Sequence, residues 1–257
     1  ECPDLALSRL HVVSCGADPG PVLDGDASST VQSAVDGRFV LCVSATFWHK
    51  NRGHAIATFG HLAASGYDGG LVIIGPEPFY GRSTDADDDI LATLSDDVAS
   101  RVVRLGTATA RDKWWLLEHA DAVLYPSVVE GFGLIPFEAA AVATPCLTFE
   151  GTAPAEFLGS TSCTIDTWDP AAWAKRVLLW IEQPQLGTGV VNEVRALVAD
   201  TTWRRCAERT WDAIDASLAQ PPVGDRPQDG GPLVRVNPRS GLTRGSARAR
   251  FTVARLR

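Results

Sequence analysis

Short apolar runs alternate with amphipathic segments along most of the chain. Five of the runs are expected to be strands, and the one at 38–45 is continuous, β-branched and bounded by turn residues, which is typical of a strand buried on both faces. The five runs cover residues 38–45, 70–75, 101–106, 121–127 and 145–149. Segments with apolar residues at helical spacing lie between them, at 51–65, 85–99, 111–120 and 133–143. This alternation predicts an α/β fold: a doubly wound parallel sheet with helices on both faces.

The two ends of the chain have a different pattern. Residues 10–15 (LHVVSC) form a strand-like run, and residues 21–37 are polar and loop-like. Helices are expected at 170–183 and 201–218, and the second carries Trp203 and Trp211 on one face. Such a face indicates a core or a seam with another domain, and a sugar-stacking platform is the alternative. After residue 219 the composition changes to Pro, Gly, Ser and Arg, which is typical of a linker or a disordered segment.

Composition and charge narrow the function class. The 257 residues are 45% apolar, which is enough for one substantial core. A net charge of −8 argues against a general nucleic-acid binder. From Pro221 onward there are eight arginines and two aspartates, so the tail is near +6 and the remainder near −14. This tail is compatible with contact to an anionic lipid surface, or with a solvated linker to another domain.

The cysteines and the apolar stretches indicate the cellular compartment of the chain, and its lack of methionine bears on whether the chain is complete. None of the six cysteines forms a Cys-x-x-Cys pair, and Cys42 and Cys146 lie in apolar runs, as expected for buried thiols in a reducing compartment. No apolar stretch approaches the ~20 residues of a membrane span, and no signal peptide is visible. No His, Cys and Asp residues have metal-ligand spacing. The chain lacks methionine, so we expect a fragment of a longer protein.

Several common motifs of α/β proteins are absent. The loop after residues 38–45 has no Gly-x-Gly-x-x-Gly dinucleotide fingerprint, and the chain has no phosphate-loop motif of NTPases and no Gly-x-Ser-x-Gly elbow of hydrolases.

The stretch SVVEGFG follows the strand predicted at 121–127 and precedes a helix. Gly131 and Gly133 let the backbone turn sharply and approach a ligand. The N-terminus of the helix attracts anions, and Glu130 and Glu138 are strong acceptors for hydroxyl groups. On spacing alone the alternative stays open that Glu138 only complements the helix dipole and that Glu130 is solvated.

Residues 120–149, ADAVLYPSVVEGFGLIPFEAAAVATPCLTF, resemble the signature of retaining glycosyltransferases of family 4, which have the GT-B fold. The E-x7-E motif of that family corresponds to Glu130 and Glu138. The resemblance extends to FVLCVSATFWHKNRGHAIATF, to LVIIG and to VVRLGTATARDKWWLLEHADA, so it covers roughly residues 10–218.

The resemblance implies a site for a nucleotide diphosphate sugar. Glu130 would bind sugar hydroxyls near the reacting carbon, and Lys50 would neutralise the diphosphate; these are the expected catalytic residues. The remaining expected donor-binding residues are Gly131, Phe132, Gly133 and Leu134 through their amides, Glu138 at the ribose, and Ala108 and Lys113 at the base. An arginine that many family members place before the lysine is missing, and His49 or Arg52 would compensate. No metal and no cofactor is expected.

The resemblance also implies that this chain is the C-terminal, donor-binding half of a GT-B hexosyltransferase. Residues 1–36 would be the crossover from a missing N-terminal domain, 37–219 the donor domain and 220–257 the tail. The acceptor would be a glycan, a lipid-linked molecule or a small molecule. The Lys-Asn pair at 50–51 favours GDP-mannose, and the expected location is cytoplasmic, with peripheral contact at the inner face of the membrane. A non-catalytic nucleotide- or glycan-binding module and a sugar-nucleotide epimerase are the alternatives.

Overall fold

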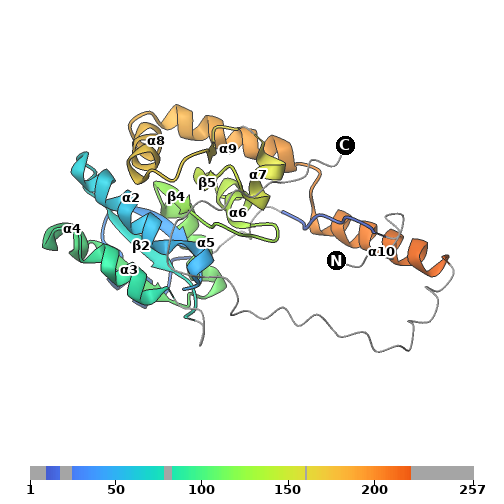
Figure 1. Ribbon diagram of the computed structural model, residues 1–257, viewed down its shortest axis with the longest axis horizontal. Coiled ribbons are helices and arrows are strands. Elements are labelled where there is room, and N and C mark those ends of the chain that lie inside the picture. Colours follow the sequence, from blue (N-terminus) through green and yellow to red (C-terminus); the bar gives the residue numbers. More distant parts are fainter. Residues whose placement is uncertain (1–9, 18–24, 78–82, 160, 221–257) are drawn as a thin grey trace, which may run out of the picture. The chain divides into compact units, whose positions relative to one another are not determined.

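A parallel sheet forms the centre of the molecule. The computed structural model describes residues 10–17, 25–77, 83–159 and 161–220. These contain six strands in the order β3-β2-β1-β4-β5-β6 (Figure 1). The strands are β1 Phe39–Val43, β2 Gly70–Ile74, β3 Val102–Gly106, β4 Ala122–Tyr125, β5 Cys146–Phe149 and β6 Thr164–Ile165. From β1 the chain proceeds to one edge of the sheet, and it then returns to the other side of β1 with β4. This order confirms the predicted doubly wound, Rossmann-like fold.

Helices connect the strands and cover both faces of the sheet. They are α1 Ser29–Ala34, the 3-10 helix η2 Trp48–Lys50, α2 Arg52–Ala64, α3 Thr84–Leu91, α4 Asp96–Ser100, α5 Ala110–His119, α6 Ile135–Ala141, α7 Ala153–Leu158, α8 Pro170–Glu182, α9 Pro184–Val198 and α10 Trp203–Leu218. Strand β1 shows how the core is divided. Val40 and Cys42 pack in the core formed with α2, α8 and α9, whereas Phe39 and Leu41 pack in the core formed with α1 and α5. This alternation follows from the two-residue period of a strand.

The segment before β1 differs from the prediction. Residues 10–15 form no strand, and Leu10 and Val12 are 54% and 95% exposed. A short apolar run becomes a strand only when it pairs with a sheet edge, and this one instead leads to a contact in which the Ala17 amide donates to Thr201 O at 2.7 Å. Within the predicted loop 21–37, residues 29–34 form α1 because Val31 is buried against the sheet; residues 21–24 lie outside the described part.

Other helices also differ from the sequence pattern. The exposed helix predicted at 85–99 is two helices, α3 and α4, separated after Leu91, and Ser95 caps the second by accepting a hydrogen bond from the Val98 amide. Asp87 in α3 is buried, although the pattern indicated an exposed helix. Strand β6 and helices α7 and α9 were not predicted. The two-residue length of β6 and the glycines Gly187 and Gly189 in α9 conceal them from pattern analysis.

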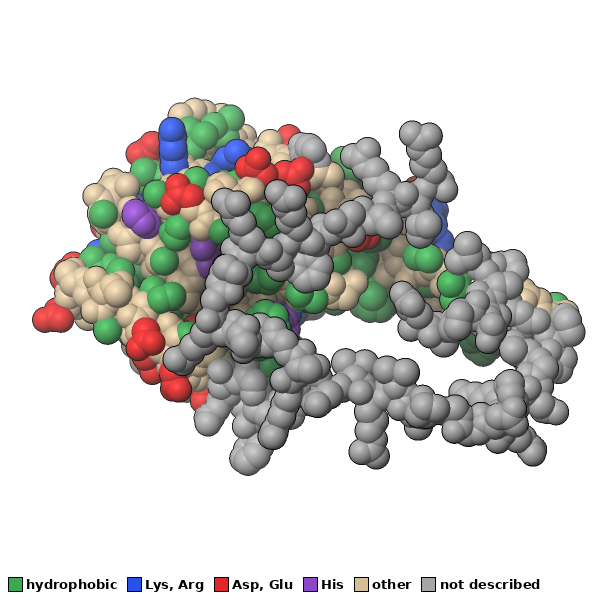
Figure 2. Space-filling view, in the orientation of Figure 1, with side chains coloured by type: hydrophobic (Ala, Val, Ile, Leu, Met, Phe, Trp, Pro, Cys, Tyr) green, Lys and Arg blue, Asp and Glu red, His purple; other side chains and the backbone are tan. Residues whose placement is uncertain are grey.

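The cysteines and the surface agree with the composition. Within the described residues Cys42, Cys146 and Cys163 are buried, and they, Cys15 and Cys206 are all free thiols. Figure 2 shows acidic side chains spread over the described part of one face, without a basic patch that extends over several elements. No helix in the described ranges has the length and apolarity needed to cross a bilayer. Residues 1–9, 18–24 and 221–257 lie outside the described part of the chain. The predicted division into a crossover at 1–36, a donor domain at 37–219 and a tail at 220–257 therefore stays a prediction.

Candidate donor site

The candidate site lies where the direction of strand order reverses. Strands β1 and β4 are parallel neighbours, so their carboxyl ends meet at one edge of the sheet. The segment 44–51 follows β1 and ends in η2, and the loop 126–134 follows β4. The Val128 amide donates to His49 O at 2.7 Å, and Ser127 Oγ donates to the same oxygen at 3.3 Å. These bonds join the two loops at the switch point, which is where open α/β sheets bind ligands.

Lys50 and Glu130 face one another across this junction. Lys50 Nζ lies 2.6 Å from Glu130 Oε1, and the two side chains are 19% and 10% exposed. The Tyr125 hydroxyl, at the end of β4, also donates to Glu130 Oε1. Burial raises the pKa of Glu130, but hydrogen bonds from Lys50, Ser127 and Tyr125 outweigh it, so the pKa lies below its ordinary value. Glu130 is therefore a fixed, ionised acceptor.

A tight turn brings backbone amides to the same place. Gly133 has φ +80°, and a Cβ added there would collide with Pro154 Cγ of α7. This position therefore requires glycine, whereas a Cβ at Gly131 would meet open space. Among the described residues, no group accepts a hydrogen bond from the amides of residues 131–134. These donors are available to an anion.

A second acid–lysine pair lies next to the turn. Glu138 of α6 accepts a hydrogen bond from Lys113 Nζ of α5 at 2.8 Å, and the side chains are 19% and 26% exposed. Its other oxygen, Oε2, is buried and has no partner within the described residues. Lys113 Nζ also lies 4.9 Å from the centre of the Trp114 ring. Ala108 is partly buried in the loop between β3 and α5 and belongs to the same apolar cluster as Trp114.

A cavity of about 220 Å³ opens beside Glu138. Its walls come from α5, from the turn and α6, and from two segments distant in sequence. The lining residues are Gly16, Ala17, Trp114, Leu134, Phe137, Glu138 and Trp203.

Arg52 is held in a buried ion pair. It is the first residue of α2 and only 3% exposed, and its Nε lies 3.4 Å from Asp87 Oδ2 while Nη1 donates to Thr46 Oγ1 at 3.1 Å. A buried guanidinium needs a counterion, and Asp87 provides it. Arg52 therefore links α2, α3 and the segment after β1, and its predicted contact with the ligand stays a prediction.

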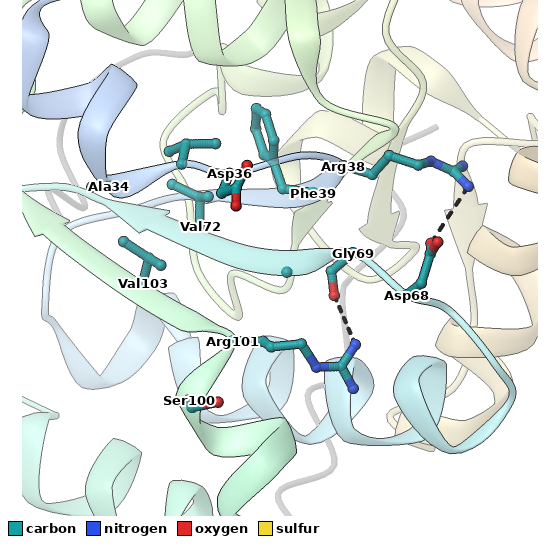
Figure 3. Close-up of a pocket in the computed structure, with 12 residues that line it drawn as sticks. Ala34, Asp36, Arg38, Phe39, Asp68, Gly69, Val72, Ser100, Arg101 and Val103 are labelled. Carbon is teal, nitrogen blue, oxygen red and sulfur yellow. Dashed lines mark hydrogen bonds and ion pairs between the residues drawn. The ribbon is translucent and has the colours of Figure 1, made fainter.

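A larger cavity, of about 330 Å³, lies at the opposite edge of the sheet (Figure 3). It surrounds the first residues of β1, β2 and β3, with Arg38 3.8 Å from Asp68 and Arg101 donating to Gly69 O at 3.0 Å. None of the predicted site residues lines it. Because ligands of such sheets bind at the carboxyl ends of the strands, this cavity is not the candidate site.

Comparison with known proteins decides the family. The sequence model of the glycosyl transferases group 1 matches residues 27–195. The chain belongs to this family. The D-inositol 3-phosphate glycosyltransferase of Pseudarthrobacter chlorophenolicus is 29% identical over 125 residues, which are 48% of this chain and 29% of that protein.

Solved structures show where the same fold occurs. A UDP-forming trehalose-phosphate synthase from Burkholderia xenovorans has a TM-score of 0.63 at 12% identity, over 75% of this chain and 47% of that one. HepE from Anabaena, in complex with UDP-glucose, has a TM-score of 0.60 at 17% identity, over 73% and 54%. At these identities the likeness shows the fold, which is that of GT-B glycosyltransferases. The chain spans about half the length of these structures, and less of the inositol-phosphate relative.

Sequence reasoning on this group 1 chain missed the partners of the two acids. Neither the Lys50–Glu130 pair nor the Lys113–Glu138 pair was predicted as a pair. Tyr125 was not a candidate, and Trp203 was named only on a helix face expected to be a core, a domain seam or a sugar-stacking platform. Tyr125 could have been found, because it is the last residue of β4 and therefore lies at the carboxyl edge. The local pattern placed Trp203 on one face of a helix, but only the fold brings that residue to the cavity beside Glu138.

Proposed function

We propose that this chain binds a nucleoside diphosphate sugar at the switch point and that the complete protein transfers the sugar to an acceptor hydroxyl with retention of configuration. One observation carries the proposal: the Lys50–Glu130 pair lies beside a turn whose amides have no partner among the described residues. A cation, free amide donors and an ionised acceptor are what a diphosphate joined to a sugar needs.

The diphosphate is assigned to Lys50 and the turn. Lys50 is 19% exposed, so its ammonium group can contact a ligand without leaving Glu130. The amides of residues 131–134 supply several donors in one place, and a nest of this kind binds phosphate oxygens. Together they stabilise the negative charge that develops on the leaving diphosphate.

The two acids are assigned to the two sugars of the donor. Glu130 accepts from hydroxyls of the transferred sugar, because its depressed pKa keeps it ionised at neutral pH. Glu138 accepts from the ribose hydroxyls, since its Oε2 is buried with no partner in the described part of the chain. Each charge-assisted hydrogen bond contributes roughly 1.5–3 kcal/mol.

The reaction exchanges one carbon–oxygen bond for another. The bond between the anomeric carbon and the diphosphate oxygen breaks, the acceptor oxygen bonds to that carbon, and the acceptor proton passes to the leaving phosphate. No residue of this chain is assigned as a covalent nucleophile.

The identity of the donor's nucleotide and sugar is inferred from one residue pair and from the ligands of related structures. The Lys-Asn pair at 50–51 favours GDP-mannose, whereas the HepE structures contain UDP or UDP-glucose. Both nucleotides therefore belong in a binding panel. A cytoplasmic location, membrane contact through the arginine-rich tail and independence from metal stay predictions.

A second domain is part of the proposal. In α10, Trp211 and Ile214 are 66% and 40% exposed, and such an apolar face is typical of an interface. We assign it to the N-terminal half of a GT-B enzyme, which would also supply most of the acceptor site. Because this chain alone spans about half of the related structures, binding without turnover is its second candidate function.

Calorimetry on the 257-residue chain tests the site. UDP, GDP, their nucleosides, UDP-glucose and GDP-mannose are titrated into wild type, Lys50→Met and Glu138→Gln, with the exposed Lys175→Met as the matched lysine control. Lys50→Met should lower the affinity for the diphosphates more than the affinity for the nucleosides. Glu138→Gln should lower both affinities, and Lys175→Met should change neither. No binding by wild type, or equal losses in Lys50→Met for diphosphate and nucleoside, would overturn the assignment. Release of free nucleoside diphosphate from the bound donor separates an enzyme from a binding module.

A further inference from the structure

The cavity beside Glu138 is walled by two tryptophans from distant parts of the chain. Trp114 belongs to α5 and Trp203 is the first residue of α10. Phe137 and Leu134 complete an apolar wall, and Glu138, with the buried and unpartnered Oε2, is the charged member of the lining. Aromatic walls with one carboxylate fit a molecule that has flat or apolar faces and hydroxyl donors.

The size of the cavity restricts what it can hold. Pockets for complete drug-sized ligands are on the order of 300–1,000 Å³, and this one is about 220 Å³. It therefore takes one part of a nucleotide sugar. The diphosphate is assigned to Lys50 and the turn, so the part left for this cavity is the nucleoside.

The backbone fixes the position of Trp203. The Ala17 amide donates to Thr201 O at 2.7 Å, and a Cβ added to Gly16 would collide with the Trp203 backbone. The segment before β1 and the beginning of α10 are thus packed so closely that only glycine fits between them. Trp203 is 49% exposed, which leaves part of its indole accessible to a ligand.

We propose that Trp203 is a nucleoside-binding residue of the donor site: together with Trp114 and Glu138 it encloses the nucleoside. This inference rests on the proposed function. It adds a contact to the nucleoside from a residue outside the two loops that follow β1 and β4. It also connects donor binding to the junction of residues 16–17 with 201–203, because a nucleoside that contacts Trp203 stabilises that junction.

Calorimetry on Trp203→Leu tests the contact, with uridine, guanosine, UDP, GDP and inorganic pyrophosphate as probes. Stacking on an aromatic side chain contributes to the binding of a base, so the variant should bind nucleosides and nucleoside diphosphates about tenfold more weakly. Pyrophosphate affinity should not change. Trp203→Phe should recover most of the loss. Trp211→Leu, on the same helix and also exposed, is the matched control and should bind like wild type.

A second variant and a spectroscopic measurement guard against a folding artefact. Gly16→Ala should weaken nucleoside binding as well, because it displaces the Trp203 backbone without altering the indole. The bound nucleotide should quench tryptophan fluorescence less in Trp203→Phe than in wild type or Trp211→Phe. Nucleoside affinity in Trp203→Leu equal to wild type, an equal loss for pyrophosphate, or unchanged quenching would overturn the inference.

These outcomes separate the inference from the proposed function. If wild type binds none of the probes, the proposed function fails, and the inference fails with it. If wild type binds and Lys50→Met weakens the diphosphates while Trp203→Leu changes nothing, the inference alone fails.

Discussion

Lys50 Nζ lies 2.6 Å from Glu130 Oε1, so the loops that follow β1 and β4 are held together by an ion pair at the switch point. The pair is largely shielded from water, and Tyr125 contributes a further hydrogen bond to the same oxygen. This arrangement gives the site its shape before a ligand arrives. Under the proposed function, a diphosphate would meet a lysine whose position is already determined, which would reduce the entropy lost on binding.

The ion pair should be measurable as a coupling in stability. Lys50→Met leaves Glu130 without its cation, and we expect a loss of about 1–3 kcal/mol in the free energy of unfolding, as for a buried acceptor that loses its partner. Glu130→Gln added to Lys50→Met should recover part of the loss, because no unpaired charge remains. A double-mutant cycle by urea denaturation measures the coupling.

The same cycle on an exposed pair is the control. Arg204 Nε lies 3.1 Å from Glu208 Oε1 in α10, but these side chains are 88% and 59% exposed, so no resolvable coupling is expected. Additive effects of the Lys50 and Glu130 variants would contradict the importance of that pair. Acid also tests it: the depressed pKa of Glu130 contributes stability that is complete above its ordinary pKa and is lost as the pH falls through the folded-state value.

Gly133 and Gly131 offer a matched comparison within one turn. Gly133→Ala places a Cβ at φ +80° and against Pro154, so it should destabilise the protein by about 1–2 kcal/mol from backbone strain alone and more from the collision. Gly131→Ala meets open space and should change stability little. Thermal and urea denaturation of both variants measure the difference. Equal stability of the two variants would mean that the tight turn does not depend on glycine at position 133.

The strands of the sheet and the glycine turn of the site were predictable because both follow from the local pattern of residues. Buried strands are continuous apolar runs, and Gly131 and Gly133 after such a run mark a turn at its carboxyl end. Residues 10–15 have the same local pattern and form no strand, because pairing depends on a neighbouring edge that the local sequence does not encode.

Side-chain partnerships could not be predicted from the residue pattern. The partner of Arg52 is Asp87, which belongs to a helix that the pattern indicated as exposed. Trp203 and Glu138 line the same cavity although 65 positions of sequence separate them. Contacts of this kind arise from tertiary packing, so residue spacing contains no signal for them.

The Arg52–Asp87 pair gives a prediction that separates structure from binding. Burial raises the pKa of Asp87, and Arg52 opposes this effect, so the two charges depend on each other. Asp87→Ala leaves a buried guanidinium without a counterion and should cost about 3–5 kcal/mol of stability. The double variant Arg52→Met with Asp87→Leu should be much closer to wild type in urea denaturation. It should also bind nucleoside diphosphates with wild-type affinity, and a clear loss there would support the predicted contact of Arg52 with the ligand.

His54 predicts how stability responds to acid. It lies in α2 with its ring 4.7 Å from Trp173 and 5.3 Å from Trp168, and its Nε2 has no partner among the described residues. Burial lowers its pKa to about 4, although Asp169 acts in the opposite direction. Between this value and the ordinary pKa near 6.5, the unfolded chain binds the proton and the folded protein does not. The free energy of unfolding is therefore not reduced by His54 above about pH 6.5, and it falls by about 2–3 kcal/mol as the pH approaches 4.

Urea denaturation from pH 4.5 to 7.5 measures that slope. His54→Phe removes the titrating group while it keeps a ring against the two tryptophans, so the free energy of unfolding of this variant should depend less on pH over this interval. His61 lies on the same helix but is exposed, and His61→Gln should retain the wild-type slope. If the free energies of unfolding of His54→Phe and His61→Gln fall in parallel as the pH is lowered, then His54 takes up its proton in the folded protein as readily as in the unfolded chain. Its pKa would then not be lowered by burial.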